Sequence, residues 1–576
     1  MKAVQKIISS TITNTYNIDI PEAKINLENP PKSEFGDYAF SCFTLARDLK
    51  KSPNIIAEEL QSVLSSQQWL HTVSTIGGYV NFFVDKKLFL EWVASLSLEP
   101  KEPKNETIIV DYIATNLGKT FHMAHMCSAM IGQSVLNIHK YLGYTTLWDS
   151  HWWDWGSLFG KLITAIKLFW DIRKLDDIGA DYIGELYVKI SNICAEDSLV
   201  ENRTRQEFLL LSKWDPENTA IWKAIITCSK KEMKFALDKM YICPDFGNGE
   251  SFYEWLPLPY DEWLPPLKYS MNDIVNELLI KWILEQNDDW SIGVNFPEET
   301  KIPSTVVRKR DGANMYLTSE LATIKYRQDN WKPSKSIYCV DMRQALHFKQ
   351  AFWMARKAWK DTENTEFNHC SYGTIYLNGK PMASRTGNVI KLRDLFTEAH
   401  TRTAAILFNK WQELSSEDID RIGIGAIKYS YLWQDREKDI TFDWDKALAF
   451  EGNSVPYIQY TYVRAKNIIE KAGKIWEINI TESVEKLTEY DTTLIKQLLR
   501  FDEVILDAAT KYKPHILAQY CYILASSFNG FYAHTPKILE ESDENLKNIR
   551  LLLVEKTRDI LEKWFDLLAI KMPSKM

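Results

Sequence analysis

The stretch at residues 108–142 constrains the fold more than any other part of this chain of 576 residues. A short run of apolar, β-branched and aromatic residues at 108–113 predicts a buried strand, and a polar turn with Asn116, Gly118 and Lys119 follows it. Apolar residues then recur mostly three or four positions apart, which predicts an amphipathic helix. A strand, a loop and a helix in this order leave unpaired N–H groups at the positive end of the helix dipole. The stretch therefore predicts a binding site for a phosphate group.

Two histidines, His122 and His125, lie three positions apart in the first turn of this predicted helix and therefore share one face. Imidazoles there can donate to phosphate oxygens as negative charge develops in a transition state. The alternative is a pair of histidines packed in the core, which the polar loop and Lys119 make the less favoured interpretation. No third ligand lies near the pair in the sequence, so we do not expect zinc. The pattern indicates chemistry on a nucleotide.

Length and composition limit the class of protein. A chain of 576 residues predicts two to four domains. No apolar run of about 18 residues occurs, and the start of the chain lacks the pattern of a secretion signal. The eight cysteines form no CxxC pair, which favours a reducing, cytoplasmic setting over a zinc ribbon or a disulfide framework. A net charge of −8 neither indicates nor excludes a nucleic-acid partner.

The sequence divides into three predicted domains. Residues 1–104 form a small α/β unit, with helices at 4–12 and 46–60, a strand at 77–84 and a linker at 99–106. Residues 105–395 alternate strand-like runs (108–113, 336–341 and 371–377) with helical patterns, as in a parallel doubly wound sheet. A mainly helical insertion is expected at about 161–266, interrupted by a turn at 243–253. From 396 to 576 strand signals vanish, and apolar residues at helical spacing predict an α-helical bundle.

A glycine- and proline-containing loop, NGKPMASRTGNV, follows the predicted strand at 371–377. Its side chains Lys380 and Arg385 could reach a polyphosphate. By itself this loop is a weak signal, and a solvated basic turn is an equally good interpretation.

Read together, these segments resemble the arginyl-tRNA synthetase family of class I aminoacyl-tRNA synthetases, and the likeness covers nearly the whole chain. ATNLGKTFHMAH (114–125) resembles the family's form of the HIGH signature, and the loop at 378–389 lies where its KMSK loop is expected. Further motifs that resemble the family are HWWDWGSLFG (151–160), GESFY (249–253), DGANMYLTSE (311–320), RQALHFKQ (343–350), FDWDKALAFEGNSVPYIQYTYVRA (442–465) and DLLAIKMPSKM (566–576).

The resemblance implies a fold of class α/β plus α. It comprises a Rossmann-like class I catalytic domain with a helical insertion, a small N-terminal domain that contacts the tRNA core, and a C-terminal α-helical domain of the anticodon-binding type. It implies ATP-dependent activation of L-arginine to arginyl-adenylate and transfer to the 3′ end of tRNA(Arg), with bound tRNA needed for activation. It further implies ATP with Mg²⁺, no structural metal, and a monomeric cytoplasmic enzyme.

The resemblance also assigns site residues. For catalysis and ATP binding it implies Lys119, His122, Ala124, His125, Met382 and Arg385. For binding the amino acid it implies Asp111, Asn116, Tyr316, Glu320 and Gln344, with the two carboxylates receiving the α-amino group or the guanidinium. Two anionic groups suit a dicationic substrate that loses its water. For tRNA contact it implies Tyr460 and Arg464, for which packing and surface roles are the plainer interpretation.

Several residues depart from the family pattern near the pocket. Ala124 stands where the family has a glycine against which adenine lies, so the added methyl is expected to weaken ATP binding. Glu320 is one methylene longer than the family aspartate, which displaces its charge. The other departures are Cys127 for arginine, Trp153 for glycine, Leu158 for glutamine, and Pro381 and Ala383 in the loop.

These departures leave two alternatives to an arginine–tRNA ligase open. One is a paralogue that activates arginine or a related amino acid for the synthesis of a specialised small molecule. The other is a catalytically impaired RNA-binding paralogue, against which Lys119, His122 and His125 speak.

Overall fold

The computed structural model describes residues 2–18, 20–21, 25, 27–28, 30, 33–65, 70–119, 121–169, 179–242, 245–254, 264–377, 380–381, 390–409, 414–473, 478–479 and 482–576. Its contacts group the chain into two compact units. Unit 1 contains Met1–Leu98, Thr461–Val504 and Cys521–Leu561, and unit 2 contains Glu99–Tyr460, Ile505–Tyr520 and Glu562–Met576.

Unit 1 begins with a four-stranded antiparallel sheet of strand order β1-β2-β4-β3. Its strands are β1 (Leu27–Glu28), β2 (Tyr38–Ser41), β3 (Leu70–Ile76) and β4 (Tyr79–Val84). Its helices are α1 (Lys2–Tyr16), α2 (Phe43–Leu49), α3 (Pro53–Leu64) and α4 (Lys86–Ala94). The helix predicted at 46–60 is therefore two helices, because Lys50 adopts a left-handed conformation (φ 51°) and Pro53 starts a new helix.

The C-terminal third contains the helices α18 (Val455–Ala472), α19 (Glu489–Leu498), α20 (Phe501–Lys511), α21 (Pro514–His534) and α22 (Glu544–Leu567), of which α19 lies wholly in unit 1 and the others have residues in both units. Within unit 1, Lys496 Nζ lies 2.5 Å from Asp37 Oδ1, and Lys86 Nζ donates to the Leu487 carbonyl at 3.1 Å. Residues from the N-terminal part and from the C-terminal third of the chain thus form one unit.

Unit 2 is built on a five-stranded sheet of order β12-β11-β5-β6-β7, in which every neighbouring pair is parallel. Its strands are β5 (Thr107–Tyr112), β6 (Thr145–Trp152), β7 (Phe246–Gly249), β11 (Lys335–Cys339) and β12 (Glu366–His369). The principal helices beside the sheet are α5 (Met123–Tyr141), α13 (Tyr316–Trp331) and α14 (Ala345–Ala358). The predicted parallel α/β sheet is confirmed.

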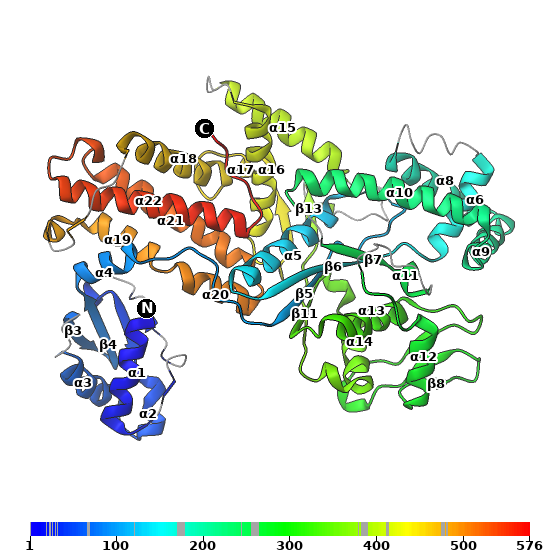
Figure 1. Cartoon of the computed structure of the whole chain (residues 1–576), viewed down its shortest axis with the longest axis horizontal. Coiled ribbons are helices and arrows are strands. Elements are labelled where there is room, and N and C mark those ends of the chain that lie inside the picture. The colour runs from blue at the N-terminus through cyan, green and yellow to red at the C-terminus, as the bar shows by residue number, and fades with distance from the viewer. Residues whose placement is uncertain are drawn as a thin grey trace. The chain divides into compact units, whose positions relative to one another are not determined.

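Successive residues of β5 show how helices cover both faces of the sheet (Figure 1). Tyr112 donates from its hydroxyl to Gln133 of α5 at 2.8 Å. The preceding residue, Asp111, accepts from Arg327 of α13 at 2.7 Å. Because adjacent strand residues point to opposite faces, α5 and α13 lie on opposite sides of the sheet.

The predicted turn at 243–253 is wrong in part. Residues 246–249 form β7, which pairs with β6 at the edge of the sheet, and α11 (Glu250–Glu254) follows. Gly247 is required for close packing, because a Cβ there would lie 2.4 Å from the ring of Trp152.

The predicted strand at 371–377 also differs from expectation. Only its end, β13 (Ile375–Leu377), is a strand, and it belongs to a separate sheet with β14 (Lys380–Pro381) and β15 (Ile440–Phe442). β15 also contradicts the expectation of no strand after 396. Its partner β13 lies about 65 residues earlier, so the pairing left no local signal.

The helices of the predicted insertion are α6 (Ser157–Phe169), α8 (Ala180–Glu196), α9 (Ser198–Ser212) and α10 (Pro216–Lys239). Trp222 of α10 donates from Nε1 to the Asp154 carbonyl at 2.8 Å and packs edge-on against Trp155. The insertion is thereby tied to the chain that leaves β6.

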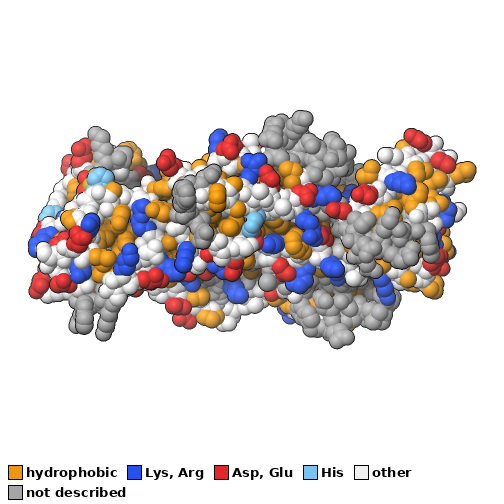
Figure 2. All heavy atoms as spheres, turned by 90° about the horizontal axis from the view of Figure 1, so that it is seen from above, with side chains coloured by type: hydrophobic (Ala, Val, Ile, Leu, Met, Phe, Trp, Pro, Cys, Tyr) orange, Lys and Arg blue, Asp and Glu red, His pale blue; other side chains and the backbone are white. Residues whose placement is uncertain are grey.

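Unit 2 also contains further α-helices and short strands. They are α12 (Met271–Ile280), β8 (Glu285–Gln286), β9 (Ile292–Val294), β10 (Thr305–Arg308), α15 (Leu392–Asn409), α16 (Ser416–Leu432) and α17 (Trp444–Ala447). Among the described helices, none is long and apolar enough to span a membrane. On the face drawn in Figure 2, the described basic and acidic side chains are interspersed, in keeping with a net charge of −8.

Candidate active site

The loop between β5 and α5 lies against the chain that leaves β6. Trp153 N donates to the Thr115 carbonyl at 2.9 Å, and Leu117 N donates back to the Trp153 carbonyl at 3.1 Å. A Cβ on Gly118 would lie 2.9 Å from Leu158 and 3.0 Å from Leu162, so glycine lets the loop pack on α6. The carboxyl ends of β5 and β6 thus hold the loop in place.

His122 and His125 are brought together as predicted. The backbone N–H of His122 donates to His125 Nδ1 at 3.2 Å, and the two rings stack with centroids 4.0 Å apart. Because His125 Nδ1 accepts, its hydrogen lies on Nε2, which is 2.9 Å from Thr115 Oγ1. The start of α5 therefore fixes both the tautomer and the orientation of His125.

Both imidazoles are neutral at pH 7. Burial and the nearby Lys119 cation lower the pKa of His122 to about 4. Burial, His122 and Lys119 lower the pKa of His125 well below its ordinary value. Each ring can therefore donate or accept a hydrogen bond, while the positive charge at this site comes from Lys119.

Lys119 lies in the loop, with its Nζ 5.1 Å from the ring centroid of Tyr187 on α8. The chain that follows the KMSK-like loop returns to the same place, because Leu392 N donates to the Phe121 carbonyl at 3.2 Å and His122 pairs with Lys391. The segment that follows the KMSK-like loop, at Lys391 and Leu392, is therefore a neighbour of the HIGH-like segment.

Two predicted residues of the KMSK-like loop, Met382 and Arg385, lie outside the described residues. The side chain of Ala124 also lies outside them, although its backbone belongs to α5.

A small cavity brings four of the predicted amino-acid-binding residues together. Its volume is about 20 Å³, enough for one water molecule. The predicted residues on its wall are Asp111, Tyr316, Glu320 and Gln344. The other lining residues are Ala114, His151, Trp153, Val340, His347 and Phe348. Asn116, the fifth predicted residue, is not among the described residues that line the cavity, although its backbone pairs with that of Trp153.

Asp111 is already engaged in a buried ion-pair network. Arg327 donates from Nη2 to Asp111 Oδ2 at 2.7 Å and from Nε to Asp149 Oδ2 at 2.6 Å. All three side chains are almost fully buried. Burial raises the pKa of Asp111 to about 7, and the Arg327 guanidinium opposes that rise. One carboxylate oxygen of Asp111 is thus committed to Arg327.

Glu320 has a different environment. Its Oε2 lies 3.5 Å from His347 Nε2, and its Oε1 is buried without a hydrogen-bond partner within the described part of the chain. Burial raises the pKa of Glu320, but the contact with His347 and the nearby His151 outweigh burial, so the net shift is downward. Glu320 is therefore an ionised carboxylate at neutral pH with one unpaired oxygen.

His151 and His347 line the cavity and Arg327 binds Asp111 in its wall, and none of the three was predicted from the sequence. His151 and His347 are the histidines of two motifs quoted for the family resemblance, HWWDWGSLFG and RQALHFKQ. Arg327 follows Glu320 by seven positions on α13, two helical turns, and so shares its face. Those two motifs and that spacing were the available signals.

Tyr460 and Arg464, the predicted tRNA-facing pair, lie one helical turn apart on α18. Tyr460 is 40% exposed. Arg464 donates from Nη1 to Asn529 Oδ1 at 2.8 Å, and its guanidinium lies 4.9 Å from the Tyr532 ring.

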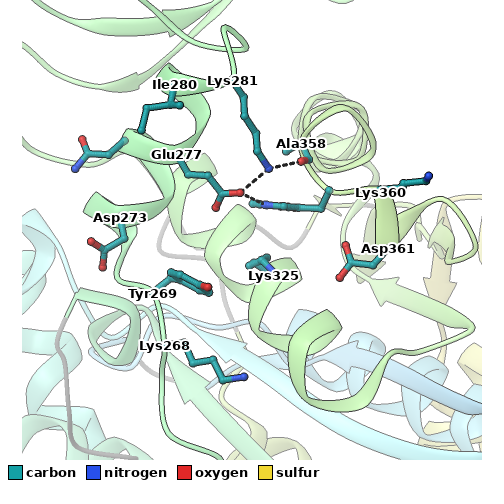
Figure 3. A pocket seen from close by; sticks show the side chains of 12 residues that line it. Lys268, Tyr269, Asp273, Glu277, Ile280, Lys281, Lys325, Ala358, Lys360 and Asp361 are labelled. Atoms are coloured by element: carbon teal, nitrogen blue, oxygen red, sulfur yellow. Dashed lines mark hydrogen bonds and ion pairs between the residues drawn. The ribbon is translucent and has the colours of Figure 1, made fainter.

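A larger pocket, of about 950 Å³, lies beside α12 and the end of α14 (Figure 3). It contains none of the residues predicted from the sequence. In its wall Glu277 accepts from Lys281 Nζ at 2.6 Å and from Trp359 Nε1 at 2.9 Å, so these groups satisfy one another. We therefore place the chemistry at the smaller cavity.

Comparison with known proteins agrees with this geometry along the whole chain. The family model for the arginyl tRNA synthetase N-terminal domain matches residues 2–84. The model for the catalytic domain of class I tRNA synthetases (R) matches residues 91–444. The DALR anticodon binding domain matches residues 458–576.

Individual relatives match from end to end. The arginine–tRNA ligase of Clostridium botulinum (strain Alaska E43 / Type E3) is 34% identical over 579 residues, with 99% of each chain covered. That of Clostridium kluyveri is 33% identical over 585 residues, covering 99% of this chain and 100% of its own. The solved structure of Thermus thermophilus arginyl-tRNA synthetase shares the fold, with a TM-score of 0.81, 22% identity and full coverage of both chains. The chain therefore belongs to the arginyl-tRNA synthetase family of class I aminoacyl-tRNA synthetases.

Proposed function

We propose that the protein is an arginine–tRNA ligase. It activates L-arginine with ATP to arginyl-adenylate and transfers the arginyl group to the 3′ end of tRNA(Arg). The observation that carries this proposal is the full-length similarity to arginine–tRNA ligases, 34% over 579 residues. The clustering of Asp111, Tyr316, Glu320 and Gln344 around one cavity supports it.

In the first step the carboxylate oxygen of arginine attacks the α-phosphorus of ATP, and pyrophosphate leaves. We assign Lys119, His122 and His125 to the phosphates, with Ala124, Met382 and Arg385 completing the ATP site. Because burial keeps the pKa of both histidines low, Lys119 supplies the charge. His122 offers an N–H to the phosphates, whereas the ring nitrogens of His125 lie against His122 N and Thr115 Oγ1, so His125 acts by holding the start of α5 in place. In the second step a hydroxyl of the terminal adenosine attacks the acyl carbon, and AMP leaves.

In the amino-acid site the substrate's cationic groups meet Asp111 and Glu320, while Asn116, Tyr316 and Gln344 contribute polar contacts. A cavity of about 20 Å³ does not admit an arginine side chain, so lining groups must move on binding.

Mg²⁺ belongs to this proposal only as a partner of the ATP phosphates. No group of three or more His, Cys, Asp or Glu side chains within the described part of the chain could hold a metal ion.

The remaining assignments concern partners and organisation. Residues 1–104 contact the tRNA core, residues 105–395 carry the chemistry, and residues 396–576, with Tyr460 and Arg464, contact tRNA through the helical domain. The enzyme acts as a cytoplasmic monomer.

Charging of tRNA by the purified full chain tests the proposal. With ATP and tRNA(Arg), labelled L-arginine should become acid-precipitable, and the other amino acids should not. Absence of charging with tRNA from any source would overturn it. AMP release with a different amino acid would instead identify a paralogue with another substrate, and tRNA binding without turnover would identify an RNA-binding paralogue.

A further inference from the structure

The two carboxylate oxygens of Glu320, at the wall of the cavity, have different surroundings. The residue is 5% exposed and lines the cavity wall. Oε2 lies 3.5 Å from His347 Nε2, and Oε1 has no hydrogen-bond partner in the part of the chain that the structure describes. A buried carboxylate oxygen without a partner is costly, so it requires a ligand that satisfies it.

The imidazole of His347 is held by its packing. Its ring centroid lies 4.6 Å from that of Tyr316 and 5.1 Å from that of Phe348. His347 belongs to the first turn of α14, whereas Glu320 lies on α13, so the contact joins two helices. The position of the histidine is therefore set independently of Glu320.

A glutamate has one more rotatable bond than the aspartate that the family pattern has at this position. The added bond gives the carboxylate more positions to occupy, and all but one of these positions must be excluded for the charge to have a defined location. A contact of 3.5 Å from the packed imidazole to one oxygen excludes most of them.

On the basis of the proposed function, we propose that His347 is a positioning residue that holds Oε2 of Glu320, so that Oε1 alone faces the cationic group of the substrate. The ligand cation is then bound through one carboxylate oxygen. A two-pronged guanidinium–carboxylate pair is excluded while the His347 contact is kept.

The test compares two amide variants of different reach. In His347→Gln the amide nitrogen can take the place of imidazole Nε2, whereas in His347→Asn it is too short to reach Glu320. We expect His347→Asn to raise KM for arginine about tenfold, as for the loss of one charge-assisted hydrogen bond, and His347→Gln to stay within about threefold of the unmodified protein. KM for ATP should change less than about twofold in both variants.

A double-variant cycle adds a second measurement. Glu320→Asp withdraws the carboxylate from His347, so combining it with His347→Asn should add little to the effect of either change. His400→Leu is the matched control, because it breaks another histidine–carboxylate contact, 2.7 Å to Asp420, outside the cavity. It should leave KM for arginine unchanged.

Equal KM for arginine in His347→Asn and His347→Gln, or a parallel rise in KM for ATP, would overturn the role of His347. Additive effects in the cycle would do the same. Calorimetric titration of each variant with L-arginine, and with the uncharged analogue L-citrulline, keeps the test independent of turnover. If the unmodified protein charges no tRNA, the proposed function fails, whereas normal charging with unchanged arginine affinity in His347→Asn defeats only this inference.

Discussion

At the candidate ATP site, individual side chains differ in charge and in packing. His122 and His125 are neutral because burial opposes their protonation, so Lys119 is the cation contributed by the loop after β5. Leu158, which replaces the family glutamine, packs beside Gly118 in the same loop. Trp153, which replaces a glycine, pairs with the loop backbone and forms part of the cavity wall. Leu158 thus supports the loop by apolar packing, and Trp153 holds it by backbone hydrogen bonds.

Lys119→Ala is expected to lower kcat for tRNA charging by about 10²–10³, because one preorganised charge is removed from the developing phosphate charge. KM for arginine should change little. Steady-state charging measures both values. Lys104→Ala, which removes a lysine packed over Tyr144, is the control and should leave kcat unchanged. A normal kcat in Lys119→Ala would contradict the assignment of Lys119 to ATP.

Ala124→Gly is expected to lower KM for ATP by about threefold or more, because the family pattern keeps this position bare for adenine. KM for arginine should stay constant, since the change lies at the nucleotide. Titration of ATP at saturating arginine and tRNA measures the effect. An unchanged or higher KM for ATP would show that the methyl does not hinder the base.

At the scale of elements, the packing of α5 on β5 sets the position of the histidine pair. Ser128 of α5 donates to the Cys339 carbonyl at 2.7 Å and accepts from Ile113 N at 2.9 Å. Tyr112 lies under the same helix, stacked on Trp148 with ring centroids 4.3 Å apart. Strands β5 and β11 thereby hold the start of α5 at the loop.

Gly132→Ala tests this packing. An added Cβ would lie 2.2 to 2.5 Å from atoms of the buried Tyr112 side chain, so helix and strand must separate. We expect a loss of about 1–3 kcal/mol in the free energy of unfolding, measured in urea, together with lower charging activity. Gly530→Ala is the matched control, because its nearest neighbour would be 3.9 Å away. That change should leave stability equal or higher, since alanine favours helix. Equal stability in Gly132→Ala would contradict the close approach.

At the scale of the molecule, one buried lysine joins three distant segments of unit 2. Lys428 of α16 donates from Nζ to the Met240 carbonyl at 2.7 Å, at the end of α10, and also to the Ala569 carbonyl near the C-terminus. Asp418 accepts from Ser574 N at 2.8 Å and so anchors the same tail. The C-terminal residues are therefore part of the packing of unit 2.

Burial lowers the pKa of Lys428 to about 7, from 10.5. Between these values the unfolded chain binds one more proton than the folded chain, so this group makes the protein more stable as pH rises. The unfolding free energy of the unmodified protein minus that of Lys428→Met should therefore increase by about 1.4 kcal/mol per pH unit between pH 7.5 and 9.5. Urea unfolding at both pH values measures it. Lys223→Met, on an exposed face of α10, should show no such growth. A constant difference for Lys428→Met would contradict a neutral buried amine.

The sequence by itself determined the fold class and the family, both of which are confirmed. The apolar periodicity of residues 108–142 predicted β5, its loop and α5, because local spacing reports which face of an element is buried. Family motifs named Asp111, Tyr316, Glu320 and Gln344, which line one cavity. Their roles as binding residues, and those of Met382 and Arg385, remain predictions.

Only the tertiary structure decided what each buried face meets. Arg327 pairs with Asp111 from 216 positions away, and β13 pairs with a strand about 65 residues later, so neither contact leaves a mark in the local pattern. The same holds for His347 and Glu320, which lie on different helices. Periodicity and composition specify that a side chain is buried, whereas the partner that satisfies its charge is chosen by the packing of the whole fold.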